Sequence, residues 1–284
     1  MITLRRAVAA TLRPFTRAAA GIAPGHRILM YHRVRDAAAR DQLSVRPARF
    51  AEQAQCLQTH RVVSLHTVCE ELQDDIRSPG VALTFDDGYT DNLLFALPIL
   101  ERFALPATIF VVIDFCGGQR QHQRYPAEPC LHLNWAQVRT LAAHPLIEIG
   151  SHSLSHPFLA NLDDDAAERE ITVSRERLQE QLDTPIRYFC YPAGNFSERE
   201  VRLVAAAGYL GAVSVRPGSN RRGQSPFALN RTEVTDDDSA ADLLAKLDGA
   251  YDLPHSILHW RRLRQFGKLR QRCADDRQRP RMEP

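Results

Sequence analysis

Two adjacent carboxylates end an apolar run in the segment 81–89, which reads VALTFDDGY. Asp86 and Asp87 repel each other when both are ionised, so a folded protein tolerates the pair beside a cation or in contact with water. Gly88 follows at once and lets the backbone turn sharply. A plain turn with a nearby helix cap would also explain these residue types, so the pair alone leaves a metal site and a turn open.

A second cluster, SHSLSHP at 151–157, spaces two histidines four residues apart. A tight turn brings such residues to one side, with Cβ atoms about 6 Å apart, and Pro157 disfavours a helix at His156. Two surface histidines are the alternative for this spacing alone. Together with an aspartate, His152 and His156 supply the donors of a catalytic divalent metal. The second aspartate would then be free to act as a base towards water activated by that metal.

The elements that must position these groups are short apolar runs alternating with helical patterns. The expected strands are 28–31, 62–64, 81–85, 107–112, 147–149, 188–191 and 211–215. The expected helices are 47–59, 91–103, 135–143, 163–182, 197–207 and a short one at 243–247. This alternation predicts a parallel α/β sheet, open or closed into a barrel. In such folds reactive groups follow the carboxyl ends of the strands, where both clusters stand.

The composition is that of a soluble globular protein: 284 residues, 44% hydrophobic and 25% charged, with a net charge of +2. We expect one domain over residues 25–250, with a basic N-terminal extension over 1–24 and a basic C-terminal tail over 251–284. These ends would either be solvated or contact an anionic membrane surface. No nucleic-acid recognition motif accompanies them.

The N-terminal segment favours a cytoplasmic location, with contact to the inner face of a membrane left open. Its apolar run 7–12 is too short for a secretory signal, and no stretch approaches the roughly 20 apolar residues of a membrane span. The cysteines lack any CxxC pair, which favours reduced thiols over a disulfide framework; they are Cys56, Cys69, Cys116, Cys130, Cys190 and Cys273.

Three stretches in this order, TFDDG at 84–88, SHSLSH at 151–156 and FCYPAG at 189–194, resemble the polysaccharide deacetylases, the NodB-homology or carbohydrate esterase 4 family. The resemblance covers roughly residues 27–247. It implies a distorted (β/α) barrel that removes N- or O-acetyl groups from sugars. Carried over by position, Asp86 is the general base, and Asp87, His152 and His156 hold a divalent metal, usually zinc, with cobalt, nickel or manganese as alternatives.

The third stretch departs from the family pattern Arg-x-Pro-Tyr-Gly, whose arginine braces the base. Cys190 stands at the arginine position and Ala193 at the tyrosine position. Arg187 lies at an odd offset, so on a strand it faces the other side. Arg231 is our candidate for the bracing role, with a surface arginine as the alternative. The segment expected to face substrate and oxyanion is Tyr191, Pro192, Ala193 and Gly194, with the Ala193 backbone N–H as the donor.

The general acid also departs from the pattern, because the late Leu-x-His of the family is missing from the barrel strands. Ile257–Trp260 reads ILHW but lies in the basic tail, whereas 28–34 reads ILMYHRV and ends an apolar run with a histidine. The early segment resembles the branch that includes poly-N-acetylglucosamine deacetylases. We therefore expect His32 to be the acid rather than His259, with a packing histidine as the alternative for either.

The expected function is a metal-dependent hydrolase that removes acetyl groups from a carbohydrate, such as a cell-surface polysaccharide precursor. Its partner would be an acetylated amino sugar or polysaccharide. A carbohydrate-binding homologue with weakened catalysis, and a deformylase or deacylase of a lipid-linked amino sugar, are the alternatives. A haloacid-dehalogenase phosphatase is less consistent, because its aspartates are separated by one residue and it has no role for the two histidines.

Overall fold

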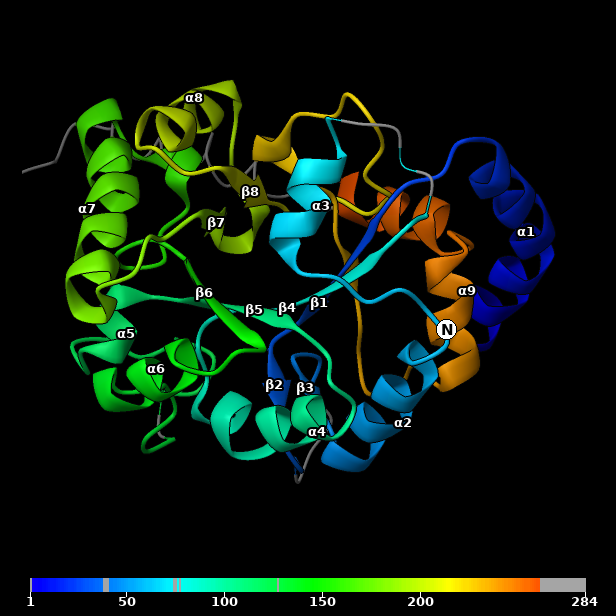
Figure 1. Cartoon of the computed structure of the whole chain (residues 1–284), viewed down its shortest axis with the longest axis horizontal. Helices are drawn as coiled ribbons and strands as arrows, with labels where there is room; N and C mark the ends of the chain where they lie inside the picture. Colours follow the sequence, from blue (N-terminus) through cyan, green and yellow to red (C-terminus); the bar gives the residue numbers. More distant parts are fainter. Residues whose placement is uncertain (1, 38–40, 74–75, 77, 127, 261–284) are drawn as a thin grey trace, which may run out of the picture.

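The computed structural model describes residues 2–37, 41–73, 76, 78–126 and 128–260, and its centre is a seven-stranded sheet (Figure 1). The spatial order is β8-β7-β6-β5-β4-β1-β9, and the ladders joining these strands are parallel. The strands are β1 (Arg27–Tyr31), β4 (Val81–Phe85), β5 (Ala107–Val111), β6 (Ile147–Ser151), β7 (Tyr188–Cys190), β8 (Gly211–Val213) and β9 (Thr232–Glu233). A separate parallel pair joins β2 (Arg33–Val34) to β3 (Ser44–Val45).

One segment contacts both edges of this sheet and curls it into a barrel. Leu229 forms a parallel bridge with Val213 of β8, and its carbonyl accepts from the Ser214 N–H at 2.8 Å. Three residues later Thr232 pairs with Leu29 of β1. The chain is therefore a single-domain distorted (β/α) barrel, and the predicted fold class is confirmed.

Helices surround this sheet, as Figure 1 shows. They are α2 (Pro47–Leu57), α3 (Leu65–Glu71), α4 (Leu97–Arg102), α5 (Ile113–Cys116), α6 (Trp135–Ala142), α7 (Asp164–Leu182), α8 (Glu198–Ala206) and α9 (Ala240–Leu247), with the shorter η1 (Asn92–Ala96), η2 (Leu159–Asn161), η3 (Pro192–Gly194) and η4 (Pro226–Ala228). Reciprocal capping boxes at Asn134, Ser197 and Ser239 start α6, α8 and α9, because each cap satisfies two backbone donors that a helix start leaves open.

Two expected elements differ from the structure. The segment 62–64 is not a strand: Val62 makes a single parallel bridge to Val81, because the N-cap Ser64 already starts α3. The helix expected over 91–103 begins as the π-helical turn η1 and becomes α-helical only at Leu97.

Alternate residues of the strands enter two different apolar clusters, as the two-residue period of a strand requires. The larger cluster contains Leu29, Leu83 and Ile109 together with residues of the surrounding helices. The smaller one contains Ile28, Ala82 and Phe110 together with residues of α3. The second set therefore faces the inside of the barrel.

The N-terminal residues form a long helix, α1 (Ile2–Ile22), that packs beside α9 (Figure 1). Ala9 is buried in a cluster with Ala245, Ala250 and Tyr251, and Arg6 and Arg13 form ion pairs of 2.7 Å with Asp242 and Asp248. Over this stretch the extension is attached to the domain instead of being solvated. A further helical segment, 252–260, follows α9.

Across the described ranges, none of the helices combines the length and the apolar content that crossing a membrane requires. The five cysteines that these ranges contain are unpaired, and Cys273 lies outside the described residues.

Candidate active site

Because side chains alternate between the two faces of a strand, the candidate site residues point to the inside of the barrel, at the carboxyl ends of the strands. Ile28 and Ala82 face inward, so His32 and Asp86, four residues further along, have the same parity. Cys190 is itself a member of the inner cluster. These groups therefore meet at one mouth of the barrel, where parallel α/β folds carry their sites.

The structure brings together the three predicted metal ligands. Oδ1 of Asp87 lies 3.4 Å from Nε2 of His152 and 3.5 Å from Nε2 of His156. His152 directs its Nδ1 at the Cys190 carbonyl, 2.8 Å away, so Nδ1 carries a proton and Nε2 is the nitrogen that faces Asp87. The two imidazole rings are 4.8 Å apart and nearly perpendicular.

Left-handed backbone conformations shape both ligand loops. Asp87, Ser153 and His156 have φ values of 70°, 70° and 60°, each costing about 1–2 kcal/mol for a residue with a side chain. Gly88 has φ 61°, and a Cβ there would stand 2.9 Å from Cγ1 of Val111. The glycine of the DDG stretch is therefore required by both the turn and the close neighbour.

This donor set fits a divalent metal ion. One ligand atom from each of Asp87, His152 and His156 lies within 4.8 Å of the others, and two nitrogens with one oxygen suit zinc with coordination positions left open. Burial lowers the pKa of His156 to about 4, which favours the neutral imidazole that a metal requires. Burial would raise the pKa of the Asp87 carboxyl, but the neighbouring imidazoles hold it well below its ordinary value.

A buried arginine forms a bidentate salt bridge with the other aspartate, Asp86. The Arg231 guanidinium donates to both oxygens of Asp86 at 2.7 Å, to the Ser214 carbonyl at 2.7 Å and to the Thr84 hydroxyl at 3.1 Å. Arg231 is 1% exposed, so it is not the surface arginine of the alternative reading. Burial alone would raise the pKa of the Asp86 carboxyl, but the charge and hydrogen bonds of Arg231 outweigh it and hold this pKa below its ordinary value.

Asp86, His152 and Cys190 form a second trio whose ligand atoms lie close together. However, the Arg231 guanidinium contacts Asp86 and stands 3.2 Å from the Cys190 sulfur. A metal ion at this trio would meet that cation, so the Asp87 trio is the better metal site.

His32 lies beside Asp86. Its Nε2 is 4.0 Å from Oδ2 of Asp86, and its side chain is 17% exposed. The Asn92 amide donates to the His32 carbonyl at 2.8 Å and fixes the strand end. His259, the alternative acid, lies on the segment 252–260 beyond α9, in the orange-to-red part of Figure 1.

The third motif forms the turn η3 beside this cluster. The Tyr191 hydroxyl donates to the Phe227 carbonyl at 2.9 Å, and its ring stacks on Phe196 at 4.1 Å, so its side chain serves packing. Ala193 is exposed with φ 51°. Pro192 and Gly194 are buried.

Sequence reasoning missed two histidines on the segment between α5 and α6. The His132 ring contacts the Asp87 carbonyl through Nδ1 at 3.0 Å. The His122 ring lies 5.8 Å from the His156 ring, with an interplanar angle of 61°. Glu128 fixes the same segment by pairing with Arg33 at 2.6 Å and with Arg35 at 2.8 Å. The loop carries no periodic pattern, so its proximity to the metal ligands had no sequence signal.

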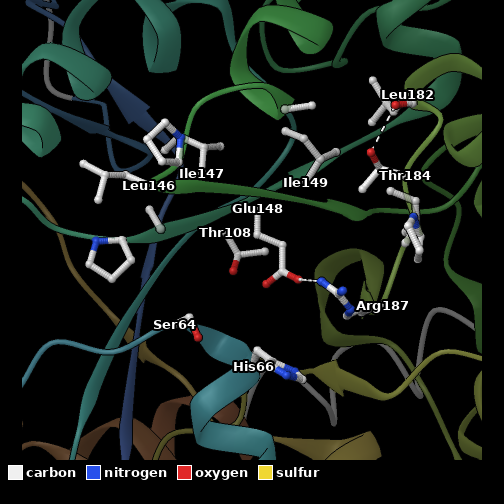
Figure 2. Close-up of a pocket in the computed structure, with 16 residues that line it drawn as sticks. Ser64, His66, Thr108, Leu146, Ile147, Glu148, Ile149, Leu182, Thr184 and Arg187 are labelled. Carbon is white, nitrogen blue, oxygen red and sulfur yellow. Dashed lines mark hydrogen bonds and ion pairs between the residues drawn. The ribbon is translucent and has the colours of Figure 1, made fainter.

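A pocket lies at the opposite, amino-terminal ends of β5 and β6 (Figure 2). Figure 2 shows Arg187 directed at Glu148, and the closest atoms are 3.5 Å apart. This agrees with the expectation that Arg187 faces away from the catalytic base. The pocket is lined by the first residues of β5 and β6 and by residues that precede the strands, so it is distinct from the site around Asp86.

Comparison with known proteins bears on this site. The family model for polysaccharide deacetylase matches residues 74–212. A Bacillus subtilis (strain 168) protein named "Putative polysaccharide deacetylase YxkH" is 31% identical over 155 residues, which are 55% of this chain and 51% of the relative. The chain thus spans about half the length of that relative.

Two solved structures share the fold. The Streptococcus pyogenes deacetylase PplD, solved with acetate, is 23% identical with a TM-score of 0.70, covering 79% of this chain and 98% of its own. IcaB from Ammonifex degensii is 24% identical with a TM-score of 0.69, covering 79% and 97%. The matched segment contains the aspartate pair, the histidine pair and the third motif, and over these residues the chain is similar to the polysaccharide deacetylase family.

Proposed function

We propose that this chain is a metal-dependent carbohydrate N-deacetylase that acts on an acetylated amino sugar. The observation that carries the proposal is the approach of the Asp87 carboxylate to the His152 and His156 imidazoles, at 3.4 and 3.5 Å. Beside this trio stands a second carboxylate, Asp86, that Arg231 keeps ionised. The match to the polysaccharide deacetylase family model over residues 74–212 supports the reaction class.

In this proposal Asp87, His152 and His156 hold a divalent ion, which on its donor set is zinc. Such an ion supplies a Lewis acid for the acetyl carbonyl and for water. Asp86 takes the proton from the attacking water, and Arg231 orients its carboxylate. His32, whose Nε2 lies 4.0 Å from the Asp86 carboxylate, gives a proton to the departing amine nitrogen. The backbone N–H of Ala193, an exposed residue, is the proposed additional donor to the oxyanion.

Metal analysis of the purified chain, combined with acetate release from a panel of N- and O-acetylated sugars, tests the proposal. We expect one bound divalent ion per chain and release of acetate from an N-acetylated amino sugar that stops on chelation and returns with zinc. Full acetate release after metal removal would contradict the proposal. Release from O-acetylated sugars alone would identify an esterase, and sugar binding without release would identify a weakened homologue.

We also propose that the enzyme works at the cytoplasmic face of a membrane, on a polysaccharide precursor. Large apolar side chains are exposed near the chain ends: Phe15 is 73% exposed, Leu253 59% and Trp260 51%. Basic residues around them would attract anionic lipids, and the apolar groups would enter the headgroup region. Flotation with anionic and with neutral vesicles tests this. We expect binding to anionic vesicles that salt weakens, whereas equal binding to neutral vesicles would contradict the electrostatic contribution.

A further inference from the structure

His132, on the segment between α5 and α6, packs against the loop that carries the proposed metal ligand Asp87. Its ring stacks on Phe115 at 4.3 Å and on Tyr89 at 4.9 Å, with interplanar angles of 30° and 22°. Nδ1 lies 3.0 Å from the Asp87 carbonyl, and Nε2 accepts from the His122 N–H at 3.2 Å. A carbonyl only accepts and a backbone amide only donates, so the imidazole is neutral with its proton on Nδ1.

The same segment pairs with the DDG loop on both sides of this contact. Tyr89 and His132 form an antiparallel bridge. The Leu133 N–H donates to the Gly88 carbonyl at 2.9 Å, and the Thr90 N–H donates to the Leu131 carbonyl at 3.0 Å. The turn after β4 is therefore held from outside by a strand-like segment of a different loop.

Asp87 requires such support because its backbone is left-handed, with φ 70°. Strained backbone of this kind persists where the surroundings over-determine it. The carbonyl of Asp87 meets His132, and its carboxylate meets His152 and His156. His132 thus contacts the main chain of Asp87, while the Asp87 side chain completes the proposed metal site.

We propose that His132 is a positioning residue whose Nδ1–H fixes the Asp87 carbonyl and thereby keeps the Asp87 carboxylate facing His152 and His156. The inference rests on the proposed metal site and adds a residue outside the ligand set. Groups that orient metal ligands through hydrogen bonds set metal affinity, and their loss costs about 10–100-fold. The metal affinity of this chain is expected to depend on His132 in the same way.

Two substitutions separate hydrogen bonding from packing. His132→Phe keeps an aromatic ring between Phe115 and Tyr89 but removes the donor. His132→Asn loses the stacked ring but places an amide N–H near the position of Nδ1. A merely structural role predicts that Asn is the more harmful change. The positioning role predicts the reverse for metal affinity, whatever happens to the melting temperature of the metal-free chain.

The experiment titrates Co²⁺ into the metal-free full chain and follows its visible absorption, with chelator competition to obtain dissociation constants. We expect His132→Phe to raise the dissociation constant about tenfold or more, and His132→Asn to stay within about threefold of the original chain. His144→Phe is the matched control, because His144 contacts Glu101 at 3.0 Å outside the site, and it should leave the affinity unchanged. An unchanged affinity in His132→Phe, or a larger loss in His132→Asn, would overturn the role of His132.

His152→Ala separates this failure from failure of the proposed function. If His152→Ala abolishes Co²⁺ binding while His132→Phe leaves it intact, the metal site is correct and the positioning role is wrong. If the original chain binds no Co²⁺, or if His152→Ala binds it normally, the proposed ligand set is wrong and the inference about His132 is refuted with it.

Discussion

Replacing Arg231 with Met should destabilise the metal-free protein strongly, because the substitution leaves a buried carboxylate without its counter-ion. Arg231 and Asp86 are 1% and 3% exposed, and two charge-assisted hydrogen bonds of 2.7 Å join them. Removing one partner of a buried ion pair typically costs about 3–5 kcal/mol. We expect Arg231→Met to lower the free energy of unfolding at pH 7 by an amount in this range.

A double-mutant cycle with Asp86→Asn shows whether the loss comes from the ion pair. In the Asp86→Asn background, Arg231→Met leaves no buried carboxylate without a counter-ion. The substitution should therefore cost about 2–3 kcal/mol less there than in the original chain. The assay is urea unfolding of the four metal-free proteins, with equal m-values as the criterion of comparable transitions. Arg187→Met is the matched control: its partner Glu148 is 3.5 Å away and Arg187 is 43% exposed, so its loss should cost no more than about 1 kcal/mol.

The stability loss caused by Arg231→Met should also depend on pH. Arg231 holds the folded-state pKa of Asp86 below its ordinary value of 3.8, so the stabilisation from the ionised carboxylate is present above that value and is lost as the pH falls. The difference between the original chain and Arg231→Met should therefore shrink under acidic conditions. Additivity of the two substitutions within about 0.5 kcal/mol, or a penalty that does not change with pH, would refute the assignment of this energy to the Asp86–Arg231 pair.

Three further predictions concern the site. Asp86→Asn should retain the metal and lose acetate release, whereas His152→Ala should lose both; near-normal activity in Asp86→Asn would show that another group is the base. Gly88→Ala should lower the free energy of unfolding by more than about 1 kcal/mol, because φ is 61° and the new Cβ meets a neighbour at 2.9 Å; an unchanged urea midpoint would contradict this. Cys190→Arg should be destabilising, since it adds a second buried cation beside Arg231, and combining it with Arg231→Met should recover part of the loss in the same unfolding assay. No recovery would show that volume, not charge, controls this position.

The parts of the site that the sequence predicts are those whose geometry is local. The DDG stretch ends a run of alternating inward and outward residues, and the two histidines stand four apart on one turn. The histidine pair and one of the two aspartates could therefore be predicted as ligands without knowing any distant contact, and the family resemblance implied that this aspartate is Asp87. The odd offset of Arg187 from the third motif likewise excluded it as the brace, and the structure directs it at Glu148 instead.

The parts that the sequence does not predict depend on long-range contacts without a periodic signal. His132 lies 45 residues from its partner Asp87, on a segment with no helical or strand pattern. The strands β2 and β3 have two residues each, too few for a hydrophobic period to register. The packing of α1 against the domain involves arginines paired with acids more than 200 residues away. The basic sequence of this segment does not distinguish a packed helix from a solvated extension.

The position of Arg231 beside Asp86 follows from how the barrel closes. Leu229 bridges β8, and Thr232 pairs with β1, so Arg231, directly before Thr232, reaches Asp86 at the end of β4. Such an arginine needs space at the end of β7, and a small residue there provides it: the Arg231 guanidinium stands 3.2 Å from the Cys190 sulfur. An arginine at both positions would place two cations against one carboxylate, which buried charges tolerate poorly. Cys190 and Arg231 are therefore complementary in this structure: the small side chain at 190 leaves the space, and Arg231 supplies the cation that contacts both oxygens of Asp86.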